Sequence, residues 1–194
     1  DPMNGRLAIE LSGAADSVTS DWDGLRLHVG SDGSVIRGLA FTGWDNPGSD
    51  GILVWGSSSH VIAGNFIGTD ATGTAAVPNA DGIYSLSANT YVGGNQLAAR
   101  NVISGNTGAG VFLTGSQGRV VGNFIGTNAA GTAAIPNGRG VWVWGSSTIV
   151  GGSTADYGNL ISGNSAAGIE VSGTPTNVAV FSNRIGVDAA GTGA

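Results

Sequence analysis

A long internal repeat constrains the fold of this chain more than any other feature. The stretch GNFIGTDATGTAAVPNADGI, residues 64–83, returns 58 residues later as GNFIGTNAAGTAAIPNGRGV, residues 122–141, with 14 of its 20 positions identical. A third copy, SNRIGVDAAGTGA, occupies residues 182–194. Self-similarity at a fixed period is typical of repeat proteins, in which each unit buries its apolar side against its neighbours.

A shorter unit lies inside this repeat. A glycine followed by an alternating apolar strand recurs at intervals of 27 to 31 residues, at Gly24, Gly51, Gly82, Gly110, Gly140 and Gly168. Each unit holds two or three short strands between Gly, Asn, Asp or Ser turns, and no segment has a sustained helical period. Such strands cannot bury an apolar side alone, so each must pair with the same strand of the next unit. The pattern predicts an all-β, single-stranded parallel β-helix of about six coils of about 29 residues, stacked about 4.8 Å apart.

The inward-facing residues follow from the same pattern. Residues 1–194 are predicted to form one domain, with a partial N-terminal coil over 1–23 and coils that begin near residues 24, 51, 82, 110, 140 and 168. Because side chains alternate along a strand, the first and third residues after each glycine should point inward. Eleven of these twelve residues are aliphatic: Leu25, Ile52, Ile83, Val111, Val141 and Ile169 in the first column, and Leu27, Val54, Ser85, Leu113, Val143 and Val171 in the third.

An asparagine recurs at a second fixed place in the unit, always two residues before an isoleucine. At a sharp turn, asparagine tolerates unusual backbone angles, and its amide can bond to the amides of the coils above and below. The sequence therefore predicts a structural ladder of asparagines that keeps the coils in register. Its members are Asn65, Asn101, Asn123, Asn159 and Asn183.

The rest of the long repeat is predicted to form outward loops. One loop covers residues 69–81 and its counterpart covers 127–139, while a second loop site, at residues 95–100 and 153–158, occurs in alternate coils. Asp70 suggests a calcium loop, but its counterparts are Asn128 and Asp188. One acid per loop is too few for a cation that takes six or more oxygen ligands. We therefore expect a turn-forming role for these residues and no metal site.

With these columns in place, the chain resembles the right-handed parallel β-helices of the pectate-lyase-like class. More narrowly, it is similar to the repeats of large bacterial surface and secreted proteins, on the motifs GN-x-IGTDATGTAA-x-x-N at residues 64–79 and RNVISGN at residues 100–106. The resemblance implies a right-handed coil and an extracellular or cell-surface bacterial protein, of which this chain is a segment. The class includes lyases, hydrolases, adhesins and passenger domains, so the resemblance does not fix an activity.

Composition narrows the range of partners. The chain has 13 acidic residues and seven arginines, for a net charge of -6, which argues against nucleic acid or an anionic membrane as partner. No apolar run approaches the roughly 18 residues of a membrane-spanning helix. Cysteine is absent, so thiolate ligands and disulfides are excluded. We expect no membrane insertion, no metal and no cofactor.

The best cluster of candidate catalytic acids is a predicted stack at one corner. Asp23, Asp50 and Asp81 directly precede three successive glycine-led strands, whereas a glycoside hydrolase needs two or three carboxylates that converge across a cleft. Asp-Gly is also a common turn, and the structural role is the alternative interpretation. The two histidines, His28 and His60, are expected to be surface residues without a catalytic partner.

The second and fourth residues after each glycine should face water, yet in the middle four coils they are mostly large and apolar. Such a patch usually marks a contact. Three interpretations remain open: another protein surface, in a homo-oligomer or in the parent protein; a loop of this chain; or a polysaccharide stacked on the rings. The predicted binding residues are Leu53, Trp55, Tyr84, Leu86, Phe112, Trp142 and Trp144.

These observations favour a non-catalytic structural or adhesive segment that displays a contact surface. The alternative is a polysaccharide-active enzyme, a lyase or a glycoside hydrolase, or a fragment of one.

Overall fold

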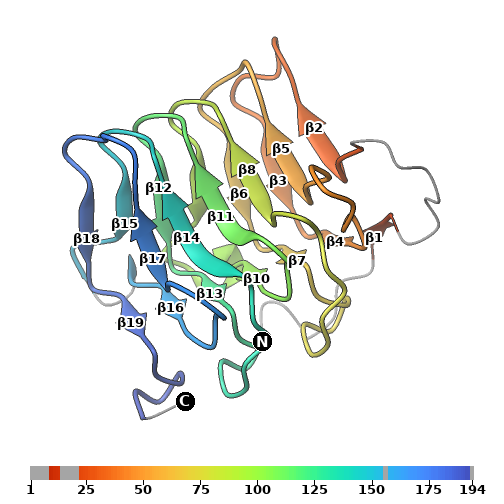
Figure 1. Ribbon diagram of the computed structural model, residues 1–194, viewed down its shortest axis with the longest axis vertical. Helices are drawn as coiled ribbons and strands as arrows, with labels where there is room; N and C mark the ends of the chain where they lie inside the picture. The colour runs from red at the N-terminus through yellow and green to blue at the C-terminus, as the bar shows by residue number, and fades with distance from the viewer. Residues whose placement is uncertain (1–8, 14–21, 155–156, 193–194) are drawn as a thin grey trace.

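The computed structural model describes residues 9–13, 22–154 and 157–192. Within them the chain winds into a parallel β-solenoid of about six turns (Figure 1). Each complete turn contributes one strand to each of three parallel sheets, so the predicted all-β repeat fold is confirmed. Its right-handedness stays a prediction. One short 3-10 helix, η1 (Leu97–Ala99), interrupts the strands.

Three sheets run along the solenoid axis, and the strand order in each follows the turn order. Sheet A contains β1 (Glu10–Ser12), β4 (Ala40–Thr42), β7 (Phe66–Ile67), β10 (Val102–Ile103), β13 (Phe124–Ile125), β16 (Leu160–Ile161) and β19 (Arg184–Ile185). Sheet B contains β2 (Leu25–Leu27), β5 (Ile52–Val54), β8 (Ile83–Ser85), β11 (Ala109–Leu113), β14 (Arg139–Val143) and β17 (Ile169–Val171). Sheet C contains β3 (Val35–Arg37), β6 (Val61–Ala63), β9 (Tyr91–Gly93), β12 (Arg119–Val121), β15 (Ile149–Gly151) and β18 (Ala179–Phe181).

The core is a set of aliphatic columns contributed by all three sheets. The strands of sheet B pair in the predicted register, so that Ile83, for example, lies between Ile52 and Val111. The inward columns of the middle turns are almost free of solvent contact. In the last turn Val171 and Ile185 occupy the same columns but are 48% and 51% exposed. The burial of a residue therefore depends on having a turn on each side.

The predicted asparagine ladder is present at the corner where the chain enters sheet A. Each side-chain Nδ2 donates to the Oδ1 of the next asparagine, and the four distances from Asn65 to Asn183, in turn order, are 3.1, 2.9, 3.0 and 2.8 Å. The same Oδ1 also accepts the backbone N–H of the preceding ladder residue. Each Nδ2 donates further to a backbone carbonyl, such as that of Val92 for Asn123 at 3.0 Å. The amide therefore satisfies donors and acceptors that are buried between turns.

A second asparagine column, which the sequence analysis missed, lies at the exit from sheet A. Its amide-to-amide distances are 2.9, 2.8 and 2.9 Å, in turn order. Each Nδ2 also donates to a carbonyl of sheet A, as Asn106 does to Ile67 at 3.2 Å. Both ends of the sheet A strands are thus held by amide stacks. The members are Asn79, Asn106, Asn137 and Asn164.

The alternation of two loops explains why the longest sequence repeat spans two turns. Loops 69–76 and 127–134 leave the solenoid after β7 and β13, and they stack on each other through the N–H of Ala129 and the carbonyl of Gly73, 2.9 Å apart. Gly73 has a φ of 67°, and a Cβ there would lie 2.8 Å from the Cβ of Ala129, so the close stacking requires glycine. The intervening turn instead carries the loop that contains η1.

The repeated loop position, Asp70 in one loop and Asn128 in the next, has the turn-forming role that the sequence predicts. Oδ1 of Asp70 accepts the N–H of Thr74 at 2.8 Å, and Oδ1 of Asn128 accepts that of Thr132 at 2.9 Å. Burial raises the pKa of Asp70, but hydrogen bonds from Thr72, Thr74 and Ala75 outweigh it, and the pKa is lowered overall. An amide performs the same task in the next loop, so the side chain serves as a backbone acceptor.

Candidate functional site

The outward side of sheet B carries a column of stacked aromatic rings. Tyr84, Phe112 and Trp142 lie in register on β8, β11 and β14. The rings of Tyr84 and Phe112 stack with centroids 4.8 Å apart and planes at 8°, and those of Phe112 and Trp142 stack at 4.2 Å and 14°. All three side chains are half-buried. The rings follow the spacing of the strands and therefore cover each other's faces.

An ion pair, a cation–π contact and a hydrogen bond close the C-terminal end of this column. The guanidinium of Arg139 lies over the ring of Trp142, 4.6 Å from its centroid, and pairs with Glu170 at 2.6 Å. The indole Nε1 of Trp142 donates to Ser172 Oγ at 2.6 Å. The column is thus fixed at this end by polar contacts to β17 and the residue after it.

A second outward row on the same sheet is more accessible. Trp55, Leu86 and Trp144 are 49%, 41% and 47% exposed, and Thr114 completes the row between the latter two. Trp144 meets Trp142 edge to face at 5.6 Å, and Trp55 meets His28 in the same way at 4.8 Å. The described part of the chain therefore leaves this row uncovered, although Leu53 and the stacked column are half-buried.

The three candidate acids form the predicted stack along one corner of the solenoid. Asp23 Oδ1 accepts the N–H of Asp50 at 2.8 Å, Asp50 Oδ1 accepts that of Asp81 at 3.3 Å, and Asp81 Oδ1 accepts that of Ala109 at 2.5 Å. Asp23 is also paired with Arg26 at 2.7 Å. Each carboxylate therefore bridges to the backbone of the next turn.

Burial in this stack opposes the ionisation of Asp50 and Asp81. Burial, together with the charges of Asp81 and Asp23, raises the pKa of Asp50 to about 8. Burial also raises the pKa of Asp81, although the N–H of Ala109 and the charge of Arg139 oppose the change. Asp50 is only 4% exposed, and the side chain of Asp23 has no exposed surface. A protonated carboxyl at neutral pH is a property of catalytic acids, but this one is shielded from any substrate in solution.

The expectation that His60 lies on the surface is wrong. His60 has no exposed surface, and its Nε2 lies 2.7 Å from Ser57 Oγ, which in turn lies 2.9 Å from Ser31 Oγ. Its Nδ1 has no hydrogen-bond partner. His60 immediately precedes β6, and its side chain points into a polar end of the core where the equivalent residue of the next turn is Thr90. His28 is exposed, as predicted.

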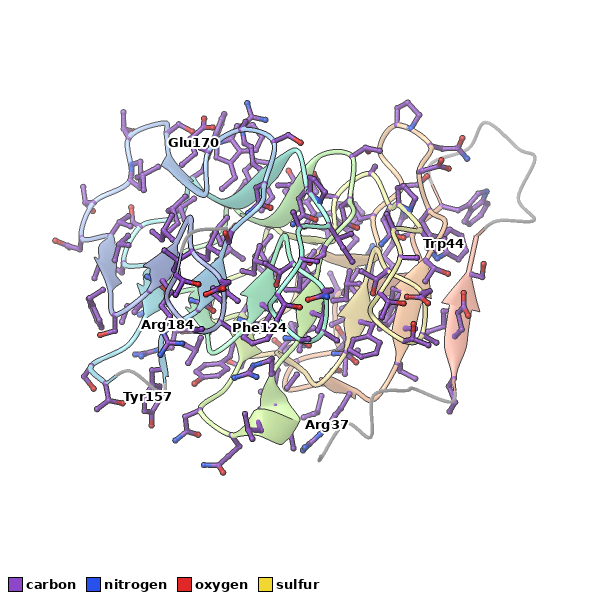
Figure 2. The ribbon with its side chains drawn as sticks, turned by 90° about the horizontal axis from the view of Figure 1, so that it is seen from below. Arg37, Trp44, Phe124, Tyr157, Glu170 and Arg184 are labelled. Carbon is purple, nitrogen blue, oxygen red and sulfur yellow. The ribbon has the colours of Figure 1, made fainter. Side chains whose placement is uncertain are left out.

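A pocket of about 280 Å³, which the sequence analysis missed, lies at the corner between sheets C and A. The η1 loop, the tight corner at Gly122 and the outward residues Phe124, Leu160 and Arg184 of sheet A line it together with Arg100. Figure 2 shows Phe124 and Arg184 on the same side of the solenoid. The sequence signal for this pocket is the loop that occurs only in alternate turns.

Residues 9–13, 22–154 and 157–192 contain no group of three or more His, Asp or Glu side chains that could hold a metal ion. The described segments also contain no helix with the length and apolarity needed to cross a membrane.

Comparison with known proteins adds no relative to this picture. No protein-family model, no curated protein and no solved structure matches the chain.

Proposed function

We propose that the chain is a non-catalytic, rigid segment that displays a protein-contact surface on the outward side of sheet B. The observation that carries this proposal is the exposed row of Trp55, Leu86 and Trp144, three large apolar side chains held in line by strand pairing. Three strand spacings separate the two tryptophans, or about 14 Å. Aromatic anchors on a rigid support lose little conformational entropy on binding.

The stacked column of Tyr84, Phe112 and Trp142 offers a polysaccharide little free ring face, which favours a protein partner. Sugar rings stack on the free faces of aromatic side chains. The faces of Phe112 are covered by Tyr84 and Trp142, and that of Trp142 also by Arg139, so this column offers edges rather than platforms. The ion pairs Arg139–Glu170 and Arg26–Asp23 neutralise charges at two borders of the face. A neutral apolar face suits a second protein surface, and a second copy of this chain is the first partner to test.

The wider setting of the proposal comes from the sequence. We infer an exported bacterial protein, at the cell surface or outside the cell, because of the resemblance in residues 64–79 and 100–106. A role as polysaccharide lyase or glycoside hydrolase finds no supporting geometry at Asp23, Asp50 or Asp81, because their carboxylates face the backbone of the next turn.

The test compares self-association and glycan activity in matched variants. Sedimentation velocity over a concentration series should show reversible association of the parent protein, and Trp144→Ser should weaken it by about tenfold, as expected when an anchor contributes more than about 1.4 kcal/mol. Val180→Ser, at a 45% exposed apolar residue of sheet C, is the control and should associate like the parent. A strictly monomeric parent would contradict contact with a second copy.

A polysaccharide screen separates the alternatives. The same proteins are tested for binding to, and degradation of, acidic and neutral polysaccharides. Glycan binding that is lost in Trp144→Ser would replace the protein partner with a carbohydrate. Degradation that is lost in Asp50→Asn would instead establish an enzyme.

A further inference from the structure

The pocket between sheets C and A arises because neighbouring turns differ at one corner. The turn that begins near residue 82 carries an extra loop there that contains η1, and the turn that begins near residue 140 carries one that contains Tyr157. The turn between them, which begins near residue 110, passes directly through Gly122. Asn95 Nδ2 donates to the Tyr157 hydroxyl at 3.1 Å, so the two loops touch across the shorter turn. The hollow of about 280 Å³ lies beside this contact. The pocket is therefore lined both by residues of the repeated strands and by the loops that occur in alternate turns.

The pocket gathers positive charge in an acidic protein. Two of the seven arginines of the chain, Arg100 and Arg184, line it, and no Asp or Glu does. The two ion pairs found among the described residues use Arg26 and Arg139 instead. Arg184 Nη1 donates to the carbonyl of Ala189 at 2.8 Å. The pocket therefore holds two guanidinium groups whose charges are not balanced by a carboxylate of its lining.

The orientation of Arg100 is fixed by its surroundings. Its Nε donates to the carbonyl of Gly122 at 3.3 Å, and its guanidinium lies over the ring of Phe124, 4.0 Å from the centroid. Burial and the nearby charge of Arg184 lower the pKa of Arg100. A half-buried cation next to a second cation is unfavourable unless an anion shares the site. A planar guanidinium held in this way is also preorganised for the parallel hydrogen bonds that oxyanions accept.

We propose that this pocket binds an oxyanion group, a carboxylate, sulfate or phosphate, between Arg100 and Arg184. Ser182 supplies a hydroxyl at the rim, and Leu97 and Leu160 supply apolar contacts for the body of the ligand. A pocket of about 280 Å³ suits a small ligand. This site lies on other sheets than the aromatic face of sheet B, so it stands or falls independently of the protein-contact surface.

The probes are sulfate, inorganic phosphate, glucuronate and glucose, each titrated into the intact protein and followed by calorimetry. At least one of the three oxyanions should bind saturably at low ionic strength, and glucose should not. Binding of sulfate or phosphate alone would identify an inorganic anion as the ligand, and stronger binding of glucuronate would identify an organic acid. Either result supports the proposal that the pocket binds an oxyanion group.

Matched variants tie the binding to the pocket. Arg184→Ala should weaken it about tenfold or more, the effect expected from losing one charged hydrogen-bonding partner. Arg119→Ala removes an exposed arginine of β12 outside the pocket and should bind like the parent. Arg100→Lys keeps the charge but loses the planar group, and should also bind more weakly while its melting curve reports on folding. The proposal is overturned if no oxyanion binds saturably, if glucose binds as well as glucuronate, or if Arg184→Ala binds like the parent.

Discussion

Asparagine and aspartate each form a stack along this solenoid, and the two side chains differ only in an amide nitrogen that replaces a carboxylate oxygen. In the ladder from Asn65 to Asn183, each side chain accepts from one neighbouring turn and donates to the other. In the stack of Asp23, Asp50 and Asp81, each carboxyl group accepts one backbone N–H from the next turn, and its ionised form has no proton to donate. The amide column can therefore extend through five turns, whereas the acidic column ends after three.

The comparison shows that stacking an ionisable side chain destabilises the fold as it becomes charged, whereas stacking a neutral amide does not. An amide stack adds no charge as it grows, but a carboxylate stack places like charges at the turn spacing in a partly buried corner. The pKa of Asp50 is raised to about 8 because this residue is buried and has a carboxyl on either side in the stack. Exchanging single residues between the two stacks therefore tests whether the nitrogen makes the difference.

Putting a carboxylate into the amide ladder should have the largest effect. Asn123→Asp removes the Nδ2 donor that serves Asn159, Val92 and Val121, and it places a negative charge where Asn123 has no exposed surface. We expect a loss of about 4 kcal/mol in the free energy of unfolding at pH 8, as for other uncompensated buried charges. Part of this should return at pH 4, where the carboxyl is protonated. Urea unfolding at both pH values measures it, and equal losses at both would argue against a charge effect.

Removing the ladder amide without adding a charge should cost less. Asn123→Ala leaves the Nδ2 of Asn101 without its 2.9 Å acceptor and empties the space of the side chain, so we expect a loss of about 3 kcal/mol that does not depend on pH. Asn183→Ala, at the half-buried end of the same ladder, is the matched control and should lose about 1 kcal/mol. Thermal melting of both variants checks the gradient. A variant at position 123 that melts like the parent would show that the ladder does not stabilise the fold.

The reverse exchange should stabilise the protein. Because the pKa of Asp50 is raised in the folded protein, its contribution to the free energy of unfolding is fully present below the unfolded pKa of 3.8. That contribution is lost as the pH rises through about 8. Asp50→Asn keeps an oxygen that can accept the N–H of Asp81 and removes the charge. We expect a gain of about 2 kcal/mol at pH 8.5 and little change at pH 4.

Asp45→Asn, at an exposed acid outside the stack, is the control for a general effect of net charge. If both variants gain equally, the raised pKa of Asp50 is not the cause. If Asp50→Asn is destabilised at pH 8.5, the carboxylate has a favourable role that the stack geometry does not reveal.

The repeated features of this fold could be predicted from the sequence because they recur in register. The aliphatic columns and the ladder from Asn65 to Asn183 stand at fixed distances from a glycine or an isoleucine in successive turns. The second asparagine column could not be predicted in this way, because the number of residues between each asparagine and the next glycine-led strand changes with the loop. Asn79 and Asn137 precede that glycine by three residues, but Asn106 and Asn164 precede it by four.

Features that belong to single turns could not be found in this way. The position of His60 is polar in neighbouring turns, with Ser34 before it and Thr90 after it, so no apolar column marks it as interior. The pocket joins Arg100 to Arg184 across three turns, and their proximity depends on how two loops fold around the shorter corner. Sequence periodicity predicts the features that recur from turn to turn, including the outward aromatic residues of sheet B, whereas the pocket depends on a loop that alternate turns lack.

The smallest expected effect concerns His60, a buried ionisable group that forms no column at all. Burial lowers its pKa below 6.5 against the opposing charge of Asp32, so its contribution to stability is present above pH 6.5 and is lost as the pH falls through the lowered value. His60→Thr, which installs the residue type of the next turn, should remove that loss. Between pH 7.5 and 5.5 the parent should therefore lose stability relative to the variant, by less than about 1 kcal/mol. The Asp50 effect has the opposite sign but is common to both proteins, so the difference in their urea-unfolding free energies isolates the histidine. His28→Thr, at the exposed histidine, is the matched control, and an equal shift in both variants would contradict the assignment to the buried ring.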